Sequence, residues 1–191
     1  MSHAHKILFA VLFFVAIFLR VWRLDSVPPS VSLDEASIGY NAFSILRTGM
    51  DEYKTKWPLV LRAYDDWRPG LYVYLVAASV PLFGLTALAV RFPSVVLSVI
   101  TMFFTFQTAR VLSRRVVKSD APALWTLSFM AISPWHIYIS RLGHEVNLGL
   151  ALFTAGAYAL CHFIVTKQTR GLYWAAVFFS LSMYGYQSEK A

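Results

Sequence analysis

The sequence is short of cysteine and of charged residues, and both shortages narrow the class of protein. Cys161 is the only cysteine in 191 residues, which excludes an internal disulfide framework. Charged residues make up 14% of the chain, against about 25% in soluble domains. Hydrophobic residues reach 58%. This composition excludes a disordered chain and argues against an ordinary soluble domain.

Long apolar runs predict an all-α, polytopic helical membrane protein with about five transmembrane helices. A bilayer core takes about 20 mainly apolar residues per helix. The segment 71–85 is shorter and contains Pro81 and Gly84, so it is either interfacial, re-entrant or a short span. The first run begins with basic residues and lacks a small-residue cleavage site, which indicates an uncleaved signal anchor. The predicted spans are 7–22, 92–112, 122–140, 146–166 and 172–186.

The positions of the charges predict an orientation. The net charge of +7 could indicate a nucleic-acid partner, but the basic residues cluster at the ends of the apolar runs. With a cytoplasmic N-terminus and no crossing by 71–85, the basic clusters at 110–118 and 167–170 fall inside, as the positive-inside rule requires. We therefore expect no nucleic-acid partner. The loop 23–70 and the turn 141–145 then share the outer face.

The outer loop 23–70 gathers most of the carboxylates, since seven of the ten acids lie between Asp25 and Asp66. A double proline ends the first span. Ser32 and Glu35 then form the S-x-x-E pattern of a capping box. Polar and apolar residues follow at helical spacing, so we expect an amphipathic helix over 33–48 in the membrane interface. We expect all secondary structure to be helical, with no β-sheet in this loop.

Two interpretations of Asp34 and Glu35 stay open at this point. The first is structural, because acids in the first turn cap a helix and complement its dipole. The second is catalytic. A carboxylate held at the membrane surface is partly desolvated, which suits Asp34 to act as a general base. Glu35 would orient Asp34 or share a metal ion with it. The spacing of the residues alone does not decide between the structural and the catalytic interpretation.

The remaining candidate residues flank the same outer face. Asp65 and Asp66, with nearby aromatic side chains, could form a second wall of a substrate cleft. Arg91 lies at an apolar border, where it either snorkels to lipid headgroups or binds phosphate. Arg141 and Glu145 stand at i, i+4, so they either form an ion pair or contribute to a site. His136 and His144 lack the spacing of a zinc site.

The ordered motifs resemble the N-terminal part of GT-C membrane glycosyltransferases, in the group of protein O-mannosyltransferases and the lipid A aminoarabinose transferase. No single motif is specific, but the ordered set over residues 20–145 is. Lys54 departs from the pattern, because the family leads us to expect glycine there. The matching elements are Arg20-x-x-Arg23-Leu24-Asp25, Pro28-Pro29, Asp34-Glu35-Ala36, Gly39-Tyr40-Asn41-Ala42, Gly49-x-Asp51-Glu52-Tyr53, Arg68-Pro69-x-x-Tyr72, Phe83-Gly84-Leu85, Ala89-Val90-Arg91-Phe92-Pro93-Ser94, Ser133-Pro134-Trp135 and Ser140-Arg141-x-x-His144-Glu145.

The resemblance implies an enzyme that moves a sugar from a polyprenyl-phosphate donor to an acceptor lipid, glycan or protein. It implies an integral protein of a bacterial or archaeal plasma membrane, with the active face outside. Asp34 would be the base, or a metal or acceptor ligand, and a divalent metal ion could join it to Glu145. Arg91 would lie near the donor phosphate, and Tyr40 would contact substrate. Because such enzymes have more spans, we expect residues 1–191 to be one membrane module and an N-terminal fragment.

A non-catalytic membrane scaffold or assembly subunit is the main alternative. A transporter ranks lower, because its ionisable residues would lie at mid-membrane. The enzyme hypothesis makes a spatial prediction. Asp34 and Glu145 are 111 residues apart but should face one outer cavity, with carboxylates within about 15 Å, the rise of roughly ten helical residues.

Overall fold

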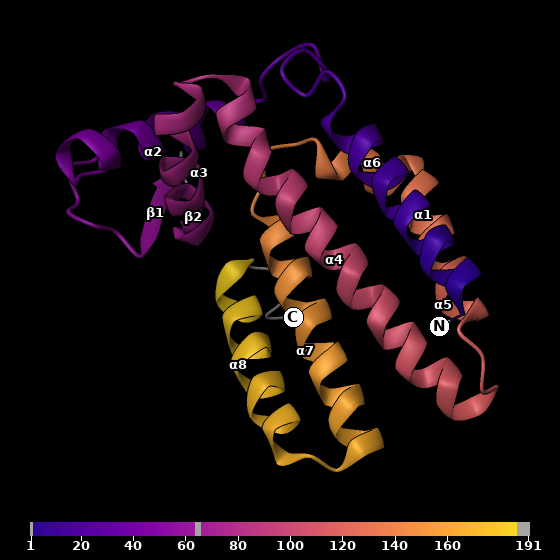
Figure 1. The fold of residues 1–191 in the computed structure, drawn as a ribbon. Coiled ribbons are helices and arrows are strands. Elements are labelled where there is room, and N and C mark those ends of the chain that lie inside the picture. Colours follow the sequence, from indigo (N-terminus) through magenta and orange to yellow (C-terminus); the bar gives the residue numbers. More distant parts are fainter. Residues whose placement is uncertain (1, 64–65, 187–191) are drawn as a thin grey trace.

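The computed structural model describes residues 2–63 and 66–186, and most of them are helical. Its long stretches run side by side (Figure 1). Within these described residues, three helices are long and apolar enough to cross a membrane: α1, α4 and α7. The expectation of an all-α fold of membrane type is confirmed, and the number of crossings stays a prediction. The long stretches are α1 (His3–Val21), α4 (Ala87–Val116), α5 (Ala121–Ile132) with α6 (Pro134–Ser140), α7 (Val146–Thr166) and α8 (Thr169–Gly185).

The order of the bundle brings distant segments to one end of the molecule. Helix α4 lies between α1 and α5 on one side and the α7–α8 hairpin on the other (Figure 1). Successive stretches alternate in direction. The end of α1, the start of α4, the α6–α7 turn and the end of α8 therefore lie toward the same end (Figure 1).

The predicted segment 122–140 consists of two helices that meet at Ser133. Pro134 has no N–H and cannot continue the hydrogen-bond ladder. The Ser133 side chain caps the new helix by accepting from the His136 amide at 3.4 Å. The last carbonyls of α5 need other donors. The buried guanidinium of Arg20 supplies them, donating to Met130 at 2.9 Å and to Ala131 at 3.2 Å.

The outer loop folds into α2 (Leu33–Thr48), β1 (Val60–Ala63) and β2 (Asp66–Pro69), and α3 (Leu71–Phe83) follows. These elements gather beside one another at the end of the bundle where α1 ends and α4 begins (Figure 1). The predicted helix 33–48 is confirmed with its capping box, and Gly49 ends it at φ +72°. Helix α3 lies against α2 at this end. Whether the segment 71–85 is interfacial, re-entrant or a short span stays a prediction.

The expectation that all secondary structure is helical is wrong for two short strands. β1 and β2 form an antiparallel pair in which Val60 faces Pro69. Leu61 and Ala63 are buried while Val60 is exposed, the alternation of a half-buried strand. Leu61 packs into the core formed by α2 and α3. Four residues of alternation are too few to stand out in the sequence. The strands leave the α2 prediction intact.

The polar stripe of α2 binds the loop that follows it. Asn41 donates to the Glu52 carboxylate at 2.8 Å and accepts from the Glu52 amide at 3.0 Å. Ser44 donates to the Met50 carbonyl at 2.7 Å. Lys54, the departure from the family pattern, has φ +66°. That left-handed conformation suits glycine best, which explains the expectation of glycine at this position.

Candidate functional site

A polar cavity of about 530 Å³ opens at the end of the bundle where the outer loop folds. Four segments contribute to it: the first turn of α2, the β1–β2 pair, the α6–α7 turn and the residue that follows α8. Three carboxylates, one arginine, one histidine and two large aromatic rings line it. The lining residues are Asp34, Ala63, Asp66, Trp67, Arg68, His144, Glu145 and Tyr186.

Asp34 and Glu145 face this cavity together, as the sequence predicts. The Asp34 side chain is 48% exposed, and its Oδ1 accepts a hydrogen bond from Arg68 at 2.8 Å. Its Oδ2 lies 4.0 Å from Nε2 of His144. Nδ1 of the same ring lies 3.5 Å from Oε2 of Glu145. One imidazole ring therefore separates the two carboxylates.

Two buried polar atoms of the cavity residues have no hydrogen-bond partner among the described residues. They are Nη1 of Arg68 and Oε2 of Glu145. A buried polar atom without a partner costs roughly 1–3 kcal/mol.

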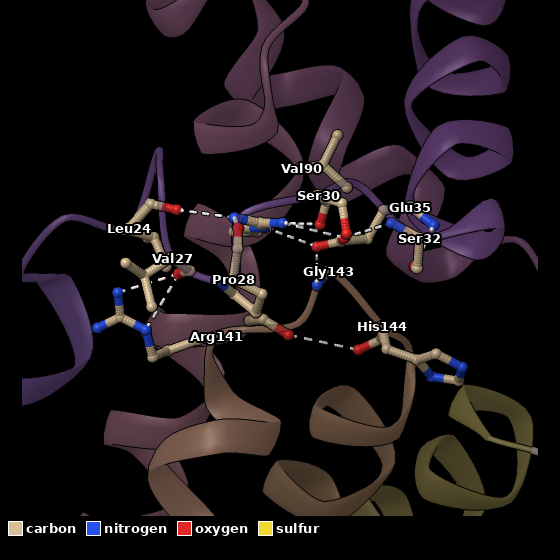
Figure 2. A network of polar contacts seen from close by, with 12 residues as sticks. Leu24, Val27, Pro28, Ser30, Ser32, Glu35, Val90, Arg141, Gly143 and His144 are labelled. Atoms are coloured by element: carbon tan, nitrogen blue, oxygen red, sulfur yellow. Dashed lines mark hydrogen bonds and ion pairs between the residues drawn. The ribbon is translucent and has the colours of Figure 1, made fainter.

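Glu35 turns away from this cavity and joins four donors (Figure 2). Its carboxylate, 2% exposed, accepts from the Ser32 amide at 2.9 Å and from Arg91 at 2.8 and 3.2 Å. It also accepts from the Gly143 amide at 2.9 Å. Burial alone raises the pKa of Glu35, but the bonds from Arg91, Gly143 and Ser32 outweigh it and lower that pKa below its ordinary value. Glu35 thus positions the residues around it.

Arg91 is fully buried, and all five of its N–H groups are used within the fold. Nε and one Nη2 hydrogen reach Glu35, and the others reach backbone carbonyls. It therefore neither snorkels to headgroups nor keeps an N–H group for a donor phosphate. Arg91 instead fixes the turn after α1. The carbonyls belong to Leu24, Pro28 and Ser30, at 3.1, 3.0 and 2.9 Å.

Arg141 also binds backbone rather than a carboxylate. Among the described residues it forms no ion pair with Glu145, so that alternative of the sequence prediction is wrong. The physical reason is local: α6 ends at Ser140, and the two residues do not share one helix. The Arg141 guanidinium donates to the Val27 carbonyl (Figure 2) and also caps the end of α1. Its acceptors are the carbonyls of Leu19, Arg20, Trp22, Arg23 and Val27.

The other predicted site residues have different positions. Asp66 lines the cavity and accepts from the Trp67 amide at 2.7 Å. Asp65 lies outside the described residues. Tyr40 is 57% exposed and lines a separate cavity of about 200 Å³ between α2 and the start of α4. No three His, Cys, Asp or Glu side chains in residues 2–63 and 66–186 form a metal-binding group. A divalent ion shared by Asp34 and Glu145 stays a prediction.

The sequence alone assigns no function to Arg68 or His144, although both line the cavity. Each belongs to an element of the resemblance, and that element is the signal that could have indicated it. Neither residue has a local pattern that indicates its neighbours, because Asp34 is 34 residues from Arg68 and 110 from His144 in sequence.

Long apolar helices with a polar, carboxylate-lined cavity at one end define an integral membrane protein with a site at the bundle end. A family model described as dolichyl-phosphate-mannose-protein mannosyltransferase matches residues 68–189. The chain therefore belongs to this family of GT-C membrane glycosyltransferases. The match includes Arg68, His144 and Glu145, while Asp34 precedes it. No curated protein and no solved structure matches the chain.

Proposed function

We propose that this chain transfers a sugar from a polyprenyl-phosphate donor to an acceptor on the outer face of a plasma membrane, with Asp34 as the base. One observation carries the proposal. Asp34 is half-exposed in a polar cavity, and Arg68, which also lines this cavity, binds one of its oxygens. A positioned base and a cation for the leaving phosphate are what this reaction needs.

The proposed reaction is a direct displacement at the anomeric carbon. The acceptor group gives its proton to Oδ2 of Asp34, and its lone pair forms the new bond to the sugar. The bond between the anomeric carbon and the phosphate oxygen breaks, and its electron pair leaves with the polyprenyl phosphate. That group gains negative charge as it leaves. The Arg68 guanidinium stabilises the charge, because a fixed arginine fork is well shaped for phosphate oxygens.

The contacts around the cavity support these roles of Asp34 as the base and Arg68 as the cation. Arg68 is 11% exposed, so its charge acts with little screening by water. The Trp67 and Tyr186 rings offer flat apolar faces beside the carboxylates. Arg91, Arg141 and Glu35 hold the surrounding loops through the contacts described above.

The test uses the full-length protein in lipid nanodiscs with dolichyl-phosphate mannose, labelled in the sugar, as the first donor. Label recovered in the protein, glycan or lipid fraction identifies the acceptor class. We expect Asp34→Asn to lower transfer by about 10²-fold or more, the usual contribution of a general base. The matched control is Asp25→Asn, an exposed acid of the same loop. A scaffold without catalysis would show equal, background transfer in all three proteins.

A further inference from the structure

His144 lines the cavity, and the proposed displacement gives it no role. Its side chain is 31% exposed. The ring packs edge-on against Tyr186, with centroids 6.1 Å apart. Its Nδ1 accepts a hydrogen bond from the Val146 amide at 3.3 Å. Its Nε2 faces Oδ2 of Asp34 at 4.0 Å. The two ring nitrogens therefore meet different neighbours.

These neighbours determine which nitrogen carries the hydrogen in the neutral ring. A neutral imidazole has one donor and one acceptor nitrogen. Because the Val146 N–H group donates to Nδ1, Nδ1 is the acceptor and Nε2 carries the hydrogen. Oε2 of Glu145 lies 3.5 Å from Nδ1 and forms no hydrogen bond with it in the part of the chain that the structure describes. The Nε2–H group thus points toward Asp34.

The gap between Nε2 and Oδ2 has the size for one bridging atom. At 4.0 Å the pair is too far apart for a direct hydrogen bond. An oxygen atom placed about 2.8 Å from each would hydrogen-bond to both. It would accept from Nε2–H and donate its own hydrogen to Oδ2. Among the described residues, none donates to Oδ2, since Arg68 is bound to Oδ1.

We propose that His144 is a catalytic residue that binds the acceptor oxygen and aims it beside Asp34. This inference rests on the proposed function, because it takes Asp34 as the base. The acceptor oxygen receives a hydrogen bond from Nε2–H through one lone pair. Its other lone pair forms the bond to the anomeric carbon, and its proton moves to Oδ2 of Asp34. The bond between that carbon and the phosphate oxygen breaks, with its electron pair on the phosphate.

The lone-pair count gives the site a preference for hydroxyl acceptors over amines. A hydroxyl oxygen has two lone pairs, one for His144 and one for the new bond. An amine nitrogen has a single lone pair, which the new bond requires. An amine would leave the Nε2–H group without an acceptor.

Two substitutions separate the hydrogen bond from the shape of the ring. His144→Phe keeps an aromatic ring against Tyr186 but removes the donor. His144→Gln keeps an N–H group near the position of Nε2. We expect His144→Phe to lower the turnover number by about 10²-fold, as for loss of one reaction-centre donor, with donor affinity unchanged. We expect His144→Gln to stay within about tenfold of the wild type. Full-rate transfer by His144→Phe would overturn the proposal.

A second measurement keeps the proposal testable if a variant fails to fold. Nitrogen-15 NMR of the wild-type protein reports which ring nitrogen of His144 carries the hydrogen. We expect Nε2 to carry it, and a hydrogen on Nδ1 in the neutral ring would overturn the proposal. The Asp34→Asn protein separates the two hypotheses. If it is inactive while His144→Phe is fully active, only the role of His144 falls. If Asp34→Asn is fully active, the proposed function falls.

Discussion

Glu35 and Gly143, 108 residues apart in sequence, are joined by a hydrogen bond of 2.9 Å from the Gly143 amide to the Glu35 carboxylate (Figure 2). Asp34 precedes Glu35, and His144 follows Gly143. The bond therefore places these two neighbours side by side at the cavity. Because Arg91 holds the same carboxylate, a buried ion pair determines the geometry of a site that it does not enter.

Removal of the Glu35 carboxylate should destabilise the fold strongly. Glu35→Ala leaves the Arg91 guanidinium buried without its anion, a change that costs about 3–5 kcal/mol. Asp34→Asn is the matched control one residue away. Asp34 is half-exposed, and an exposed ion pair contributes about 1 kcal/mol or less. Reversible denaturant unfolding in detergent measures both. An equal loss of unfolding free energy in the two variants would contradict the structural role that we assign to Glu35.

The lowered pKa of Glu35 predicts a loss of stability in acid. A carboxylate with a lowered folded-state pKa contributes stability that is fully present above its unfolded pKa of about 4.3. That contribution is lost as the pH falls through the lower folded-state pKa. We expect the free energy of unfolding to decrease as the pH falls below the unfolded-state pKa of Glu35. In Glu35→Gln this part of the decrease should vanish, and an unchanged pH profile would refute the linkage.

Gly143 should tolerate no side chain. A Cβ atom there would lie 2.5 Å from a methyl carbon of Val90 and 3.0 Å from the Val90 carbonyl oxygen. We expect Gly143→Ala to displace the 141–145 turn and to lower transfer more than tenfold. Adding Val90→Ala removes the methyl clash but keeps the carbonyl contact, so rescue should be partial. Activity assays of the single and double variants test this, and wild-type transfer by Gly143→Ala would contradict it.

The topology gives a prediction that does not depend on the reaction. In a Cys161→Ser background, a cysteine at exposed Lys54 should react with an impermeant thiol reagent added outside intact cells. A cysteine at Val116, which is 80% exposed at the other end of the bundle, should react only after permeabilisation. Labelling of position 116 from outside would mean that the segment 71–85 crosses the membrane.

Helices with strong local signals were predicted at their observed bounds. The capping box and Gly49 determined α2 over 33–48, and the apolar run determined α7 over 146–166. The short strands were missed, since their few alternating residues gain stability from contacts of Leu61 with distant helices. Sequence patterns therefore predicted the helices that interactions between nearby residues stabilise. They did not predict the strands, which depend on contacts with distant residues.

The arginines show the limit of prediction from sequence. Arg91 and Arg141 were expected to meet lipid, phosphate or Glu145, and both bind mainly backbone carbonyls far along the chain. Any residue presents a carbonyl, so no sequence pattern indicates such a partner. The joint position of Asp34 and Glu145 was predictable because topology placed both on one face. The contact of Arg68 with Asp34 and the place of His144 between the two carboxylates required the fold.

The decisive measurement is single-turnover transfer by the full-length Asp34→Asn protein already loaded with donor. Binding of dolichyl-phosphate mannose is measured first, so that loss of catalysis is separated from loss of donor affinity. We predict that the affinity of the variant for the donor stays within a few fold of the wild-type value. We predict that the loaded variant transfers the sugar at least about 10²-fold more slowly than the wild type. Arg68→Gln should instead weaken donor binding. Transfer at the wild-type rate by loaded Asp34→Asn would contradict the assignment of Asp34 as the base.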